Sequence, residues 1–178
     1  MRPRHIFAAL LLLAGSVWAT TLEQLSVDQM VQQSSAIVRA KVTGSFTANR
    51  NGTIYTYYHL QVVENLKAST PPTVDVAVPG GSLGRVMQSV AGAPELKAGG
   101  EYVLFLWTSR SGLTQIIGLS QGAFDVRPNV GDALLSRPPV KEQMLDAKGS
   151  VVADKGVTLG LSELRARLEA LVDMGGVR

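Results

Sequence analysis

Histidine and cysteine, the residues that most often carry catalytic or metal chemistry near neutral pH, are scarce in this sequence. Its 178 residues include no cysteine and only two histidines, His5 and His59. Thiol catalysis, disulfide exchange and cysteine-ligated metals are therefore excluded. Beyond the N-terminal segment His59 stands alone, so no site with several histidine ligands can form. A Ser-His-Asp arrangement would have to combine His59 with serines and acids that lie scattered along the chain.

Carboxylates are the other residues that would support catalysis, because a pair of them can hydrolyse a glycosidic bond. In this sequence the acids occur singly, at Glu64, Asp75, Glu95, Glu101, Asp125 and Asp132. The glycine-rich segment 80–84 lacks the lysine and the following helix of a nucleotide-binding loop. Nucleophile-elbow and zinc-protease motifs are also missing. The sequence thus indicates no catalytic residue, no metal site and no cofactor.

The strongest candidate for a binding surface is an aromatic segment, residues 54–63. Strand alternation would place Tyr58, Leu60 and Val62 on the face toward the core. The opposite face would then carry Tyr55, Tyr57, His59 and Gln61. Aromatic side chains with polar tips suit protein interfaces and stacking on sugars or bases. The alternative is that this face is covered by the C-terminal helix or by the segment 128–160.

The N-terminal residues 1–19 have the features of a cleaved secretory signal peptide. Basic residues at the start precede an apolar run over 6–14, and small residues precede a cleavage site between Ala19 and Thr20. The apolar run is about half of the roughly 20 residues that a membrane-spanning helix needs. We therefore expect an exported protein, periplasmic or extracellular, without a stable membrane anchor after processing.

Processing would change both the length and the charge of the chain. Removing 19 of the 178 residues leaves a mature chain of 159, a size that suits one domain. Arg2 and Arg4 leave with the signal, which takes the 17 basic residues to 15 against 14 acidic ones. This near-neutral balance argues against a nucleic-acid partner.

The elements that would position the aromatic segment are mostly strands. A short helix is expected before residue 35, with Ser26 and Gln29 as its capping box. Strands are predicted at 36–42, 54–63, 73–78, 85–90, 101–107, 113–119 and 122–127. Asn51 and Gly52 favour a type I′ turn between the first two strands, because both residues of that turn need a positive φ. We expect 101–107, the most hydrophobic strand, at the centre of the sheet, and 113–127 to form a hairpin through Ser120 and Gln121.

The organisation predicted from these elements is a mainly β, OB-like small barrel over residues 20–127, either closed or partly open. A sandwich is the alternative. Residues 128–160, rich in Pro, Gly, Asp and Lys, are expected to form an irregular surface segment. A C-terminal helix over 161–174 carries an apolar stripe at Leu164, Leu168 and Leu171, which we expect to dock on its own domain.

The strand region also carries a resemblance to known families. Segments 34–42 and 58–67 resemble the first strands of netrin-like domains, which include the tissue inhibitors of metalloproteases. The stretch 22–127 is similar to a group of exported bacterial proteins of uncharacterised function. Its marks in this chain are the segments 79–81, 91–94, 100–106 and 118–122. Some members of that group appear alongside matrixin-type metalloproteases.

The resemblance implies an OB-fold and a protein partner, which would be a metalloprotease in one specific version. The metalloprotease inhibitors chelate the protease zinc through the amino group and carbonyl of an N-terminal cysteine held by disulfides. Here Thr20 would occupy that position, and no disulfide is available to fix it. The expected function is an exported, non-catalytic binding module with Thr20, Tyr55, Tyr57 and His59 as contact residues. The alternatives are an envelope hydrolase that uses loop carboxylates and an oligosaccharide-binding domain.

Overall fold

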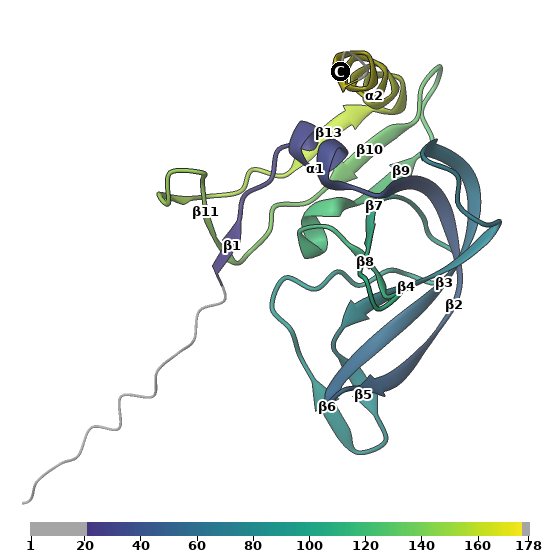
Figure 1. The fold of residues 1–178 in the computed structure, drawn as a ribbon, viewed down its shortest axis with the longest axis vertical. Coiled ribbons are helices and arrows are strands. Elements are labelled where there is room, and N and C mark those ends of the chain that lie inside the picture. Colours follow the sequence, from purple (N-terminus) through teal and green to yellow (C-terminus); the bar gives the residue numbers. More distant parts are fainter. Residues whose placement is uncertain (1–20, 176–178) are drawn as a thin grey trace, which may run out of the picture.

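A computed structural model describes residues 21–175 of the chain (Figure 1). The predicted signal peptide and its cleavage site at Ala19 and Thr20 lie outside the described residues. The fold is mainly β, with two α-helices, as the sequence predicts. These helices are α1 (Val27–Gln33) and α2 (Leu161–Gly175).

Most strands belong to one antiparallel sheet. Its order across the sheet is β13 (Val157–Gly160), β10 (Leu134–Arg137), β9 (Ala123–Arg127), β7 (Glu101–Thr108), β2 (Ala36–Arg50), β3 (Thr53–Lys67) and β4 (Thr73–Pro79). A short strand, β8 (Thr114–Ile116), pairs with the end of β7. The central place of β7 confirms the prediction for the most hydrophobic segment.

Two smaller sheets complete the fold. In one, β1 (Thr21–Glu23) pairs in parallel with β11 (Gln143–Leu145), which in turn pairs with β12 (Val151–Val152). The other is a hairpin of β5 (Gly81–Leu83) and β6 (Val86–Gln88). This hairpin packs on the distal ends of β2 and β3, at the opposite end of the molecule from α2 (Figure 1).

The main sheet is strongly curved but is not closed into a barrel. Register shifts in β2 between Ile37 and Ala40, and again around Thr43, bend this long strand. The curvature brings β4 beside β8, although no ladder of hydrogen bonds joins these two strands in the described part of the chain.

Two local predictions of chain geometry are confirmed. Asn51 and Gly52 both have positive φ, 53° and 85°, as a type I′ turn between β2 and β3 requires. The Ser26 hydroxyl accepts a hydrogen bond from the Gln29 amide, and the Gln29 side chain accepts one from the Ser26 amide. This reciprocal capping box starts α1 where the sequence places it.

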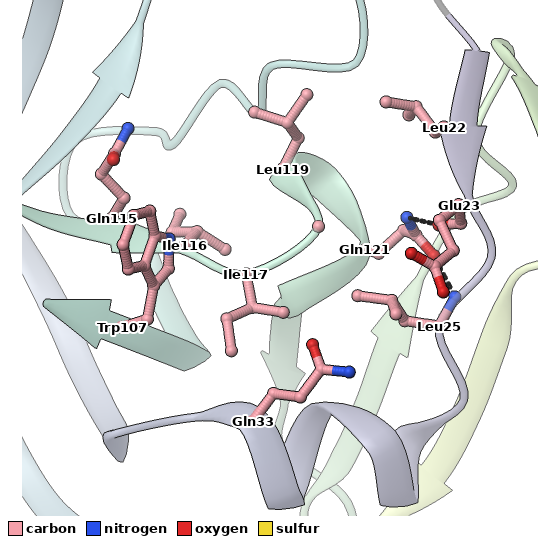
Figure 2. Close-up of a pocket in the computed structure, with 11 residues that line it drawn as sticks. Leu22, Glu23, Leu25, Gln33, Trp107, Gln115, Ile116, Ile117, Leu119 and Gln121 are labelled. Atoms are coloured by element: carbon pink, nitrogen blue, oxygen red, sulfur yellow. Dashed lines mark hydrogen bonds between the residues drawn. The ribbon is translucent and has the colours of Figure 1, made fainter. Parts of the chain in front are cut away.

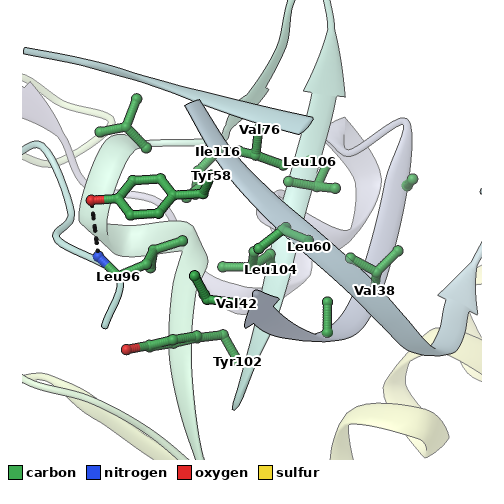
Figure 3. Close-up of a cluster of buried hydrophobic side chains, with 13 residues drawn as sticks. Val38, Val42, Tyr58, Leu60, Val76, Leu96, Tyr102, Leu104, Leu106 and Ile116 are labelled. Carbon is green, nitrogen blue, oxygen red and sulfur yellow. Dashed lines mark hydrogen bonds between the residues drawn. The ribbon is translucent and has the colours of Figure 1, made fainter. Parts of the chain in front are cut away.

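The strand β7 is buried on both faces and separates two hydrophobic clusters. Leu104 and Leu106 point into the cluster inside the curved sheet, which Figure 3 shows. The members of this inner cluster include Val38, Val42, Tyr58, Leu60, Val76, Tyr102 and Ile116. Val103 and Phe105 face the other cluster, which α1 and α2 cover. The C-terminal helix contributes Leu161, Leu164 and Leu168 to it, so its predicted docking on its own domain is confirmed.

The predicted hairpin over 113–127 is wrong. Its two strands, β8 and β9, do not pair with each other but follow one another along the same edge of β7. The 3-10 helix Leu119–Gly122 lies between them, and Gln121 in that helix is only 1 % exposed. Because this polar side chain bonds to backbone groups of Glu23 and Leu25, the segment folds inward instead of turning at the surface.

The segment 128–160 differs from the predicted irregular segment, because it contains β10, β11, β12 and β13. Two of these strands extend the main sheet beyond β9. Leu135, Met144 and Leu159 are buried, and they anchor the segment to the body of the protein.

A buried ion pair organises the middle of this segment. The Arg137 guanidinium donates two hydrogen bonds to the Asp154 carboxylate, and both side chains are 4 % exposed. Asp154 also accepts hydrogen bonds from the backbone amides of Val140 and Gly156, at 2.7 and 3.2 Å. Burial alone would raise the pKa of Asp154, but these donors and the charge of Arg137 lower it below its ordinary value.

Phe105→Ala tests the double burial of β7. Phe105 is 1 % exposed, so its loss leaves a cavity between the sheet and the helices. We expect the free energy of unfolding, measured by urea titration, to fall by about 3–5 kcal/mol. Val63→Ala is the matched control, because Val63 is 55 % exposed and its change should stay within about 0.5 kcal/mol. Equal effects of the two substitutions would contradict the two-cluster core.

Asp154→Asn tests the buried ion pair through its pH dependence. The folded-state pKa of Asp154 lies below the unfolded value of about 3.9, so the ionised carboxylate stabilises the fold above that pH. The substitution should lower the free energy of unfolding by about 3–5 kcal/mol at neutral pH, because it leaves Arg137 buried without its counter-charge.

The stability difference between wild type and Asp154→Asn should shrink as pH falls through the lowered folded-state pKa of Asp154. Urea titrations between pH 7 and about pH 2 measure the difference. A difference that does not vary with pH would contradict the assignment, and Asp75→Asn at the exposed surface is the control.

Candidate functional site

Tyr55, Tyr57 and His59 lie on the outer face of β3, as the alternation predicts. Tyr58 and Leu60 between them are 7 % and 1 % exposed and belong to the inner cluster. The structure adds Phe46 of β2, which lies directly opposite Tyr57. We call Phe46, Tyr55, Tyr57 and His59 the aromatic row.

The rings of the aromatic row contact one another across the β2–β3 hairpin. Phe46 and Tyr57 are stacked, with ring centroids 5.0 Å apart and planes 11° from parallel. The His59 ring lies 5.2 Å from Phe46, and Tyr55 lies 6.2 Å from Tyr57. Phe46 is nevertheless 46 % exposed. The row is therefore an ordered aromatic surface that faces solvent.

His59 is oriented by Asp75, its neighbour on β4. The His59 Nδ1 and the Asp75 Oδ1 are 2.5 Å apart, and both side chains are about half exposed. Among the described residues, Asp75 supplies the one side-chain hydrogen bond to the His59 ring. Since no serine hydroxyl joins this pair, the structure does not assemble the Ser-His-Asp arrangement considered from the sequence.

Neither segment expected as a cover lies over the aromatic row. The helix α2 reaches β3 farther along, where Arg165 bonds to Glu64 at 2.7 Å. The segment 128–160 extends the sheet on the far side of β7. Gln61, the next residue on the same face, is also exposed.

A second exposed apolar surface lies on the β5–β6 hairpin. Leu83, Val86 and Met87 are 39 %, 61 % and 79 % exposed. The Thr47 hydroxyl donates a hydrogen bond of 2.7 Å to the Ser82 carbonyl, which ties this hairpin to β2. The sequence predicted a short strand here, but strand patterning alone carried no signal that its apolar residues would face solvent.

A groove lies beside the N-terminal strand, and Figure 2 shows its lining. Its volume is about 540 Å³. The apolar part of the lining comprises Leu22, Leu25, Trp107, Ile116, Ile117 and Leu119. Thr20, the predicted N-terminal contact residue, lies outside the described residues, immediately before β1.

Gln121 holds the N-terminal segment against this groove (Figure 2). Its side-chain carbonyl accepts a hydrogen bond from the Leu25 amide, and its side-chain NH2 donates one to the Glu23 carbonyl, both at 2.9 Å. On the opposite edge of β1, the Gln24 amide donates to the Leu145 carbonyl at 2.8 Å. The chain after residue 20 is therefore fixed on both edges without a disulfide.

Carboxyl groups with shifted pKa values have structural roles in this fold. Hydrogen bonds from Ser162, at the start of α2, lower the pKa of Asp132. Asp154 shares the lining of a groove with Asp146, whose carboxylate accepts hydrogen bonds from the amides of Lys148 and Ser150. A general acid needs a raised pKa, whereas the pKa of Asp154 is lowered. Asp154 therefore lacks the raised pKa that a general acid in this groove would need.

Over residues 21–175, no three histidine or acidic side chains come together in a way that would hold a metal ion. Neither of the described helices has the length and apolar character that a membrane crossing requires.

A scan against models of known protein families, and searches of curated proteins and of solved structures, find no match to this chain. The similarity to netrin-like domains and to exported bacterial proteins stays a prediction from the sequence.

Gln121→Leu tests how the N-terminal segment is held. The substitution keeps the size of the side chain but leaves the Leu25 amide and the Glu23 carbonyl without partners. We expect hydrogen exchange at the Leu25 amide to become roughly tenfold faster or more. Gln115→Leu, in the lining of the same groove, is the control. Unchanged protection of Leu25 would show that β11 alone holds the segment.

Proposed function

We propose that this protein is an exported, non-catalytic binding module that acts on a protein partner through the aromatic row. The observation that carries the proposal is that Phe46, Tyr57 and His59 form an ordered row of rings on a sheet face that no other element of residues 21–175 covers. Aromatic residues are the commonest anchors of protein interfaces, because they bury large areas with few rotatable bonds.

The packing within the row favours tight binding. Because Phe46 and Tyr57 already stack on each other, a partner need not order them, and the entropy cost of association is reduced. The β5–β6 hairpin lies at the same end of the molecule (Figure 1) and packs on the inner side of β2 and β3, so it supports the strands that carry the row.

The orientation of the rings favours a protein over an oligosaccharide. Sugars stack flat on exposed ring faces. Phe46 and Tyr57 instead each cover one face of the other, with planes 11° from parallel across the two strands. This stacking reduces the flat ring surface left for a sugar, whereas the side chains of a protein surface can also contact ring edges.

The finer features of the proposal rest on the sequence. The predicted signal peptide supports export to the periplasm or beyond, and the bent β2 strand with β4 beside β8 is compatible with an OB-like, netrin-like arrangement. A metalloprotease as the partner, and Thr20 as a second contact residue, rest on the resemblance alone. The hydrogen bonds of Gln121 would give Thr20 a fixed neighbour in place of a disulfide.

Tyr57→Ala tests the aromatic row. The mature protein, tagged at its C-terminus, is used to capture partners from the exported fraction of its host, and recovered proteins are quantified by mass spectrometry. We expect wild type to retain a specific protein in stoichiometric amount and Tyr57→Ala to recover roughly tenfold less of it. Gln61→Ala, on the same strand face but outside the row, is the matched control. Equal recovery by all three proteins, or turnover of a substrate by the pure protein, would contradict the proposal.

A further inference from the structure

The distal half of β2 has an open edge. β2 pairs with β7 only from Ala36 to Lys41, and Val42 makes the last bonds on that side, with Gly99 and Gly100. From Ser45 to Arg50 the described backbone pairing of β2 is with β3 alone. One edge of this part of the strand is therefore without a backbone partner among the described residues.

The turn geometry identifies the backbone groups on that edge. In a two-residue hairpin the residues flanking the turn, Arg50 and Thr53, form a hydrogen-bonded pair, and hydrogen-bonded and non-bonded pairs then alternate. Asn49 and Ile54 are therefore a non-bonded pair. Consistently, the Ile54 amide and carbonyl bond away from β2, to the Gln88 side chain at 2.9 Å and to the Gly80 amide at 2.8 Å. By the same alternation, the amides and carbonyls of Ser45, Thr47 and Asn49 point to the open edge.

Residues 45–49 of this edge carry no charged residue or proline that would prevent strands from associating, and the bulge that bends β2 lies before them, around Thr43. Such edges are normally blocked by a lysine, by proline or by an inward-pointing charge. Phe46 lies on this stretch, and Tyr57 of β3 stacks against one face of the Phe46 ring. No described strand lies beside Phe46 on the side away from β3.

We propose that this edge pairs with the same edge of a second copy of the chain, antiparallel about a two-fold axis at Thr47. Thr47 would then lie opposite Thr47 of the second copy, and Ser45 opposite Asn49. This register gives every amide and carbonyl on the open edge a partner. Two-fold axes centred on Phe46 or Ala48 would leave some of them unpaired.

The side chains are complementary in the same register. Phe46 faces Ala48 of the second copy, so a large residue meets a small one, and the two Phe46 rings lie diagonal to each other within reach. Arg50 faces Gly44, which keeps the two arginines apart. Because one segment supplies both halves of this match, a second copy fits the edge better than an unrelated strand. The pairing does not depend on what the aromatic row binds.

Cysteine substitutions test both the dimer and its register, because the chain has no native cysteine. Cα atoms in a hydrogen-bonded antiparallel pair are about 5.5 Å apart, a distance that a disulfide spans. Thr47→Cys should form covalent dimers under mild oxidation. Ser45→Cys and Asn49→Cys should remain monomeric on a non-reducing gel when each is alone, but should cross-link when they are mixed.

Ser45→Pro provides an independent measurement by sedimentation velocity across a concentration series. Proline removes an amide that points away from β3, so the hairpin keeps its own ladder while the dimer loses a bond. We expect the dimer dissociation constant to rise roughly tenfold, whereas Ser45→Ala, which keeps the amide, should match wild type. A wild-type protein that stays monomeric throughout the series would overturn the proposal. So would a dimer that Thr47→Cys does not trap or that Ser45→Pro does not weaken.

Discussion

The double burial of β7 is the constraint on which the other elements depend. Alternate residues of this strand enter different clusters, Leu104 into the curved sheet and Phe105 beneath the helices. A shift of one residue in its register would exchange the contents of the two clusters, so the register is strongly specified. One edge of β7 then sets the position of β2, and the other edge sets β8 and β9 in succession. Both helices lie on the Phe105 side, which is the outer face of the sheet, but at its proximal end, where Arg165 of α2 bonds to Glu64 of β3.

Without cysteine, this chain holds its peripheral segments with long polar side chains that bond to backbone groups. Gln121 holds the N-terminal segment, and Asp154 fixes the loops around β10 together with Arg137. Lys67 reaches the end of α1, where its ammonium donates to the carbonyls of Val31 and Ser34, each at 2.6 Å. Burial lowers the pKa of Lys67, as expected for an ammonium group taken partly out of water. Each of these side chains satisfies backbone groups that would otherwise be costly to bury.

These long-range bonds also explain which features could be predicted from the sequence. The capping box at Ser26, the turn at Asn51 and the alternation in β3 depend on neighbouring residues, and all three predictions hold. Gln121 looked like a turn residue because its partner Leu25 is 96 positions away. The Pro, Gly, Asp and Lys content of residues 128–160 indicated an irregular surface segment, because the pairing of Arg137 with Asp154, 17 positions further along, cannot be read from composition. Phe46 was missed because it lies among small polar residues, and only the pairing of β2 with β3 brings it to Tyr57.

The β2–β3 hairpin is longer than the pairing of β2 with β7 requires. The pairing of β2 with β7 ends before Gly44, yet the hairpin continues to Arg50. Ordering each further residue costs roughly 1–2 kcal/mol of backbone entropy, and an isolated two-stranded ribbon is marginal in water. The β5–β6 hairpin supplies support on the inner side, where Gly81 lies against Ile54 and Thr56 and Ser82 bonds to Thr47. The outer side is thereby left free while the strands beneath it are held rigid. This is the arrangement that an interaction surface requires, because a partner then meets aromatic side chains that are already in place.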